Sequence, residues 1–152
     1  MAGLQTGHGS TLAFGTTTTF SPGYTSIGGP GWTRDSIDTS TLATTGARTY
    51  IGGDLWGISP IVSTYLLDPS TLADGAGPPA PEANSIDSLL FDSMGTVMAP
   101  DETITITLSN TASFSGSGHV TALEVEDLTT DALIAASLSV QFADTPTVAD
   151  GT

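Results

Sequence analysis

Cysteine and lysine are both absent from the 152 residues, and the only basic side chains besides two histidines are Arg34 and Arg48. Without cysteine the chain can form no disulfide, no thiolate metal site and no cysteine nucleophile, so stability must come from packing and assembly. Sixteen acidic side chains give a formal net charge of -14. A nucleic-acid-binding protein places cations on phosphates, and this chain has almost none to place, so ordinary DNA or RNA binding is not expected.

Long hydrophobic runs are also missing. No segment approaches the ~18 consecutive apolar residues of a membrane-spanning helix, and the N-terminus has no charged start followed by an apolar run. We therefore expect a soluble protein that is not processed for export and has no membrane partner. Twelve of the acids are aspartate. This bias is typical of proteins of salt-loving archaea and their viruses, and it favours a high-salt origin. In molar salt the Debye length is about 3 Å, so the repulsion between the acidic side chains is screened. Simple solubility, or a surface to which DNA does not stick, are the alternative explanations.

The residues that are present predict a mainly β protein. A chain of this length indicates a single domain over residues 1–152. Aliphatic residues alternate with Thr or Ser in several segments, which is typical of strands with one buried face. In one of them the apolar phase slips near Ala122 and Leu123, which indicates a β-bulge. The expected strands cover residues 102–109, 114–126, 134–142 and 59–67, with two short strands around Gly15 in 11–20.

Residues 85–94 predict one α-helix, capped by Asn84 or Ser85, with its apolar side chains at helical spacing. Two segments resist regular assignment: a proline-rich surface loop at 68–83 and a long loop at about 33–57. A loop of that second length inside a compact domain usually has a function. The predicted fold is an antiparallel β-sandwich or partly closed barrel of seven to nine strands with one flanking helix.

The candidate catalytic and metal-binding residues do not match the patterns that these functions require. His8 and Ser10 lie close together in sequence, but the pair lacks a nucleophile elbow. His119 would need further ligands, and the chain has only two histidines. Asp35 and Asp38 do not follow the calcium-loop spacing, because an aliphatic residue stands where a ligand should be. We therefore expect no enzyme, no metal site and no cofactor.

The two arginines call for acidic partners. Both belong to the 33–57 segment, so the scarce positive charge lies on the largest irregular element. A planar guanidinium is suited to a bidentate contact with a carboxylate across an interface. An intramolecular surface pair, which contributes little stability, is the alternative.

The succession of segments resembles the major tail tube proteins of long-tailed phages and of archaeal tailed viruses. The resemblance covers most of the chain, and no single motif in it is diagnostic. It rests on the order of the segments GSTLAFG, GGPGWTRDSIDTSTL, ARTYIGG, LWG and SPIVSTYLLDP, followed by the short helix, the closing strand from Asp131 to Phe142, and TPT.

This resemblance implies a tail tube subunit that self-assembles into stacked hexameric rings around a channel through which genomic DNA passes without specific binding. Partners would be further copies of the chain and other tail proteins, in the virion tail after assembly in the host cytoplasm. The long loop would reach the next ring. The candidate contact residues are Trp32, Arg34, Asp35, Asp38, Arg48, Tyr50 and Trp56. The alternative function is a monomeric β-sandwich binding, capsid-decoration or adhesin-like module, with Trp32, Tyr50 and Trp56 as its binding patch.

Overall fold

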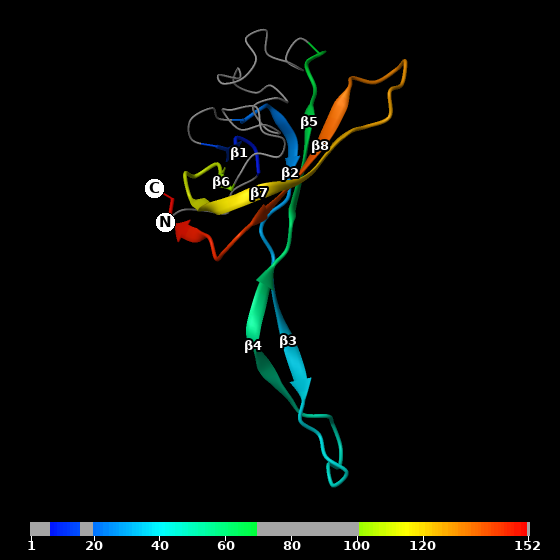
Figure 1. The fold of residues 1–152 in the computed structure, drawn as a ribbon, viewed down its shortest axis with the longest axis vertical. Coiled ribbons are helices and arrows are strands. Elements are labelled where there is room, and N and C mark those ends of the chain that lie inside the picture. Colours follow the sequence, from blue (N-terminus) through cyan, green and yellow to red (C-terminus); the bar gives the residue numbers. More distant parts are fainter. Residues whose placement is uncertain (1–6, 16–19, 70–100, 152) are drawn as a thin grey trace.

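The fold is built from antiparallel strands. The computed structural model describes residues 7–15, 20–69 and 101–151. Within these residues the strands form one seven-stranded sheet and a separate two-stranded hairpin, β3–β4, that projects from the body (Figure 1). The strands are β1 (Thr11–Phe14), β2 (Tyr24–Ile27), β3 (Trp32–Asp38), β4 (Tyr50–Ile58), β5 (Ile61–Leu66), β6 (Glu102–Thr107), β7 (Ser113–Val125), β8 (Ala135–Phe142) and β9 (Thr147–Ala149).

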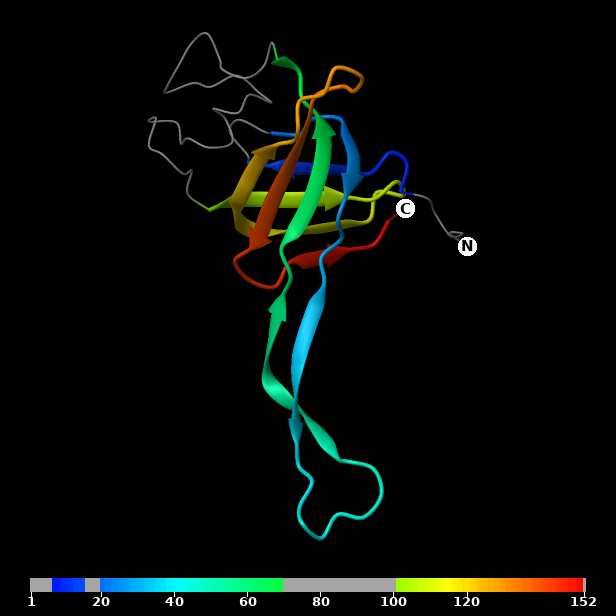
Figure 2. The same cartoon turned by 90° about the vertical axis from the view of Figure 1, so that its right-hand side faces the viewer.

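The large sheet curls into a half-barrel. Its strand order is β1-β6-β7-β8-β5-β2, with β9 paired to β7. Strand β7 belongs to both halves, because its first part pairs with β6 and its second part pairs with β8. Figure 2 shows β5 and β8 crossing in front of β1 and β6. Apart from β3 and β4, the described strands therefore form one continuous curled sheet, which corresponds to the partly closed barrel of the two predicted forms and not to the two packed sheets of a sandwich.

A bulge and a glycine mark the bend in β7. The register with β8 shifts between Val120 and Ala122, where the sequence predicted it. Just before the bulge, a Cβ placed on Gly118 would overlap the Ile104 side chain and the Gln141 backbone. The strand can bend and pack closely here only because residue 118 has no side chain.

The core lies between the two halves of the curled sheet. Strand β8 alternates strictly, so that Leu138 and Val140 are fully buried while Ser137 and Ser139 face away from the core. Burial of one such aliphatic side chain contributes about 1.5–3 kcal/mol. Tyr65 makes edge-to-face contacts with Phe20 and Tyr24, at centroid distances of 5.6 and 5.9 Å. Burial raises the pKa of both tyrosine phenols.

Most strand predictions are confirmed. Residues 102–109 and 59–67 contain β6 and β5, 114–126 covers β7 except its first residue, and β8 within 134–142 is central, between β7 and β5. In 11–20, β1 precedes Gly15, and Phe14 and Phe20 form an isolated bridge, while residues 16–19 lie outside the described residues. The predicted helix at 85–94 and most of the proline-rich loop at 68–83 lie outside the described residues. No helix in the described ranges is long and apolar enough to span a membrane.

One prediction of irregular structure was wrong. Residues 33–57 are mostly β-hairpin, with β3 and β4 in antiparallel register and residues 39–49 joining them. The hairpin is hard to recognise from sequence because all seven residues of β3 are exposed. A strand without a buried face lacks the alternation by which strands are identified.

Candidate assembly surfaces

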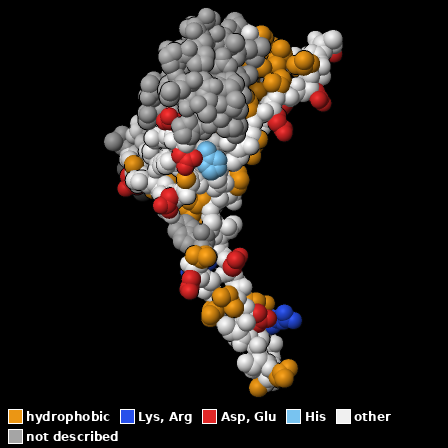
Figure 3. All heavy atoms as spheres, viewed as in Figure 1, with side chains coloured by type: hydrophobic (Ala, Val, Ile, Leu, Met, Phe, Trp, Pro, Cys, Tyr) orange, Lys and Arg blue, Asp and Glu red, His pale blue; other side chains and the backbone are white. Residues whose placement is uncertain are grey.

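The projecting hairpin carries exposed apolar side chains that its own chain does not cover. Ile37 and Ile51 are cross-strand partners, and each is more than half exposed. Figure 3 shows such side chains along the hairpin, interspersed with acidic ones. The large exposed hydrophobic residues of this element are Trp32, Ile37, Leu42, Tyr50, Ile51 and Leu55. Exposed apolar groups gathered on one element indicate a surface that another molecule covers.

Arg34 stabilises the hairpin from within. Between Arg34 and Ser36 the register shifts, so that β4 has extra residues at this point. The Nε of Arg34 donates a hydrogen bond to the carbonyl oxygen of Gly53 in the shifted segment. The guanidinium lies against Gly52, where a Cβ would come 2.8 Å from Cζ. No carboxylate of the described residues lies within 4.0 Å of the Arg34 guanidinium. The acidic partner predicted for Arg34 is therefore not found among the described residues.

The second arginine has an acidic partner within the hairpin. Arg48 Nη1 lies 3.5 Å from Asp38 Oδ2, and both side chains are well exposed. Asp38 also accepts a hydrogen bond of 2.8 Å from the Ser40 main-chain N–H. That bond, with a smaller side-chain contribution from Ser40, lowers the pKa of the Asp38 carboxyl. Asp38 therefore caps the turn that leads out of β3, and the ion pair is the intramolecular alternative considered for Arg48.

The remaining predicted contact residues are distributed along the hairpin. Trp32 lies at its base, with its ring 6.0 Å from that of Phe114 on β7. Tyr50 lies opposite Asp38, and Trp56 pairs through its backbone with Arg34. Asp35 lies beside Gly53, its carbonyl oxygen 3.2 Å from where a Cβ of that glycine would stand. The structure thus brings Asp38, Arg48 and Tyr50 together at the distal end.

The titratable residues weighed for chemistry form no catalytic or metal constellation in the described ranges. His119 Nδ1 lies 3.2 Å from Asp101 Oδ1, and both side chains are about half exposed. His8 lies in the turn before β1 and is exposed. No group of three or more histidine, aspartate or glutamate side chains in the described ranges is placed to hold a metal ion.

Two open strand edges are a second candidate surface. Strand β2 ends the sheet beyond β5, and its other edge has no strand partner among the described residues. The N–H of Gly28 donates to Val62 O on β5, so in the antiparallel alternation Ile27 directs its backbone groups to the open edge. In the same way Glu126 N–H donates to Ala135 O, which leaves the N–H of Val125 on the open edge of β7.

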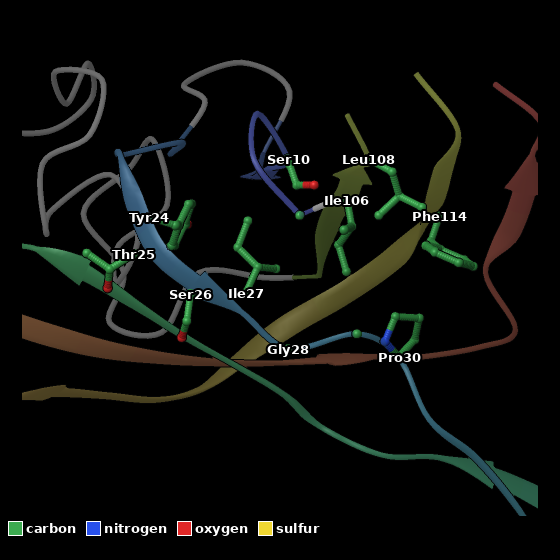
Figure 4. A pocket seen from close by; sticks show the side chains of 12 residues that line it. Ser10, Tyr24, Thr25, Ser26, Ile27, Gly28, Pro30, Ile106, Leu108 and Phe114 are labelled. Carbon is green, nitrogen blue, oxygen red and sulfur yellow. The ribbon is translucent and has the colours of Figure 1, made fainter. Parts of the chain in front are cut away.

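A pocket lies beside the β2 edge. It has a volume of about 380 Å³ and opens between β2 and the ends of β6 and β7 (Figure 4). Ile27, Ile106, Leu108 and Phe114 give it apolar walls. Among the described residues that line it, Tyr24 is the only ionisable one. The described part of the pocket therefore offers an apolar surface and an exposed strand edge.

Sequence reasoning missed these edges and most of the aliphatic hairpin residues. Edge exposure depends on which strands pair, and pairing joins residues far apart in the chain, such as Tyr24 with Tyr65. The sequence does contain a local indication of this pair, since Ile37 stands between Ser36 and Asp38, and Ile51 stands next to Gly52. That signal has meaning only once the hairpin register is known.

Solved structures show the same fold. A chain of an extracellular contractile injection system, in a structure of the PVC sheath/tube terminator in the extended state, superposes with a TM-score of 0.66 at 14% identity, covering 98% of this chain and 99% of that chain. A chain from the tail of an empty gene transfer agent (GTA) particle, refined with C6 symmetry, has a TM-score of 0.65 at 11% identity, covering 97% and 100%. A chain of the six-fold symmetrised baseplate of the anti-feeding prophage (AFP) has a TM-score of 0.63 at 12% identity, covering 95% of each.

These likenesses identify the class of fold. The chain has the fold of subunits of tail particles and contractile injection systems, over nearly its whole length. No protein-family model matches the sequence, and no curated protein matches it. At 11–14% identity the similarity resides in topology and not in shared side chains.

Proposed function

We propose that the protein is the tail tube subunit of a long-tailed virus and acts by self-assembly, not by catalysis. Its copies form hexameric rings that stack into the tube of the virion tail. The proposal is supported by the fold shared with subunits of tail particles, by the C6 symmetry of the GTA tail, and by the assembly surfaces of the chain itself.

The two open edges of one four-stranded unit carry the proposal. Strands β2, β5, β8 and the second part of β7 are antiparallel neighbours, so β2 and β7 at the two ends run in opposite directions. When a copy is rotated about an axis roughly parallel to the strands, its β2 edge meets the β7 edge of the next copy in antiparallel orientation. A head-to-tail contact of this kind closes a ring when the rotation closes. Closure also removes both exposed edges, which would otherwise invite aggregation.

Six copies would produce a barrel wide enough for a channel. Each copy contributes four strands, so the ring would contain roughly 24, more than the ~16 that already leave an aqueous channel in porins. The hairpin projects from the body roughly along the strands of this unit (Figure 1). The hairpin would thus reach the neighbouring ring, and contact with that ring would cover the exposed hairpin residues Ile37, Ile51 and Leu55. Other tail proteins would contact the tube ends, and the virus would assemble in the cytoplasm of a high-salt host.

A variant pair on β7 tests ring closure. Val125→Pro removes the N–H that faces the open edge and leaves the ladder to β8 intact, while Val125→Ala shortens the same side chain and keeps the N–H. Purified protein is concentrated in molar salt and imaged by electron microscopy. We expect rings and tubes from the wild type and from Val125→Ala, and unassembled folded protein from Val125→Pro. Tubes formed by the proline variant would contradict edge pairing.

A hairpin variant tests stacking separately. Ile37→Ser together with Ile51→Ser removes apolar area that the free chain exposes, so the fold of the monomer should be little affected. We expect single rings without tubes. The alternative function, a monomeric binding or decoration module, predicts a wild-type protein that stays monomeric at every salt and protein concentration. In that case the hairpin variants would change ligand binding and not assembly.

A further inference from the structure

The proposed ring determines which face of the four-stranded unit lines its interior. One face of β5 and β8 packs on the core, together with β1 and β6, and so carries the body of the subunit. Six bodies placed inside a closed barrel would collide, whereas outside it they diverge. The uncovered face, which Figure 2 presents to the viewer, must therefore point at the axis. This step rests on the proposed function.

The uncovered face consists of small, mostly neutral side chains. Cross-strand partners share a face, so Ser139 lies beside Val62 and Ser137 lies beside Thr64. On β7 the partners of these serines are Ala122 and Glu124. Gln141 is also on this face, next to His119 at its margin, where the imidazole contacts Asp101. Within the described strands of the unit, Glu124 is the only carboxylate on this face. Glu126, just past the end of β7, continues the ladder through its N–H bond to Ala135 O and so lies on the same face.

Most of the acidic side chains in the described residues lie outside this face. They are on the hairpin, after β5, in the loop between β7 and β8, and in or near β6 and β9. Figure 3 shows acidic side chains along the hairpin and at the margins of the body. They include Asp35, Asp38, Asp54, Asp68, Asp127, Asp131, Asp144 and Asp150. A net charge of -14 therefore does not imply an acidic channel.

We propose that the channel is lined by a mostly neutral hydroxyl and aliphatic surface, with carboxylates at one end only, from Glu124 and Glu126, and that this lining suits the passage of nucleic acid. A polyanion adheres where cations replace its counterions, and this face offers none. Low-dielectric walls lined densely with carboxylates would raise a barrier to entry of the same polyanion. Hydroxyl groups keep the wall hydrated and avoid both effects. Under this proposal most of the described acidic charge lies away from the channel.

The absence of native cysteine allows a direct test of the lining. Ser139→Cys places a single thiol on the uncovered face, and Thr147→Cys places one at an exposed position on β9 as a control. Assembled tubes are treated with a small maleimide, or with a maleimide on a carrier too wide for the channel. We expect Cys at 139 in tubes to react with the small reagent only, the control to react with both, and both thiols to react with both reagents before assembly.

Other outcomes are equally decisive. Reaction of the residue 139 thiol with the wide carrier in intact tubes, or with neither reagent, would overturn the assignment of this face. Ser137→Cys, on the same face, repeats the test if the first variant does not assemble. Failure of the wild type to form tubes would instead refute the proposed function, so the two failures are distinguishable.

The neutrality of the lining has its own experiment. Tubes of Ser139→Lys, of Thr147→Lys and of the wild type are assembled with short double-stranded DNA and then treated with nuclease. We expect protected DNA only in Ser139→Lys tubes, with the protected amount falling as salt rises. Protected DNA in wild-type tubes at low salt, or none in Ser139→Lys tubes, would contradict the proposal.

Discussion

Gly52 lies against the guanidinium of Arg34, and we predict that the effect of Gly52→Ala changes sign with the residue at position 34. The new Cβ would lie 2.8 Å from Cζ and 2.9 Å from Nε, closer than real Cβ contacts. The arginine must then move, and its hydrogen bond to Gly53 O is lost. Gly52 does not have a positive φ, so alanine fits the backbone.

The magnitudes follow from two opposing effects. A hydrogen bond from a charged donor contributes about 1.5–3 kcal/mol, and we take the lower end because Arg34 is on the surface. Replacing a strand glycine by alanine gains about 0.5–1 kcal/mol. Gly52→Ala should therefore cost the hairpin about 0.5–1 kcal/mol in the wild type and gain a similar amount in Arg34→Ala. The coupling free energy is about 1.5 kcal/mol, or roughly tenfold in the opening equilibrium.

Hydrogen exchange of the unassembled protein measures this coupling. Peptides covering residues 32–58 report the local opening of the hairpin in the wild type, the two single variants and the double variant. Gly57→Ala is the matched control, because its Cβ would meet Thr33 Oγ1 at an ordinary 3.6 Å. Its effect should be the same with and without Arg34. An effect of Gly52→Ala that has the same sign and size in both backgrounds would refute the role assigned to Arg34.

Three further predictions concern the body and the distal end of the hairpin. Leu138→Ala should lower the free energy of unfolding by about 2–5 kcal/mol in urea titrations because Leu138 is fully buried, whereas Ser139→Ala, one residue along on the open face, should change it by less than about 0.5 kcal/mol. Carbon NMR titration should place the pKa of Asp38 below its ordinary value, and Ser40→Ala should keep most of the shift because the main-chain N–H is the leading cause. Since the folded pKa is lowered, the contribution of Asp38 to hairpin stability is present at neutral pH and is lost as the pH falls through that lowered value. Arg48→Ala should change the unfolding free energy of the monomer by about 0.5 kcal/mol or less, because the exposed ion pair with Asp38 contributes little, and a larger loss would show that the pair is stronger than its exposure indicates.

Strands β1, β5, β6, β7 and β8 were predictable because each has a buried face, whereas β2 and β9, which have none, were not predicted. In β6 and β8, aliphatic residues alternate with Thr, Ser or Gln, since one side of each strand packs on the core and the other does not. The slip in β7 was visible for the same reason, because a bulge shifts the alternation by one residue. These features depend only on neighbouring residues, so they can be recognised from the sequence alone.

The hairpin, the half-barrel and the assembly surfaces depended on pairing. The sequence of β8 does not reveal whether its polar face meets solvent, another sheet or a channel. Nor do the sequences of β2 and β7 show that these strands are the two ends of one antiparallel unit. Likewise, Arg34 looks like a docking residue in sequence, because the glycine that receives its hydrogen bond is nineteen residues away. Composition and alternation thus specify a lysine-free, acidic β chain with its buried positions, since those properties belong to individual residues and their neighbours. The distribution of the acidic charge in space, the open edges and the neutral face are properties of strand pairing, and only the tertiary structure decides them.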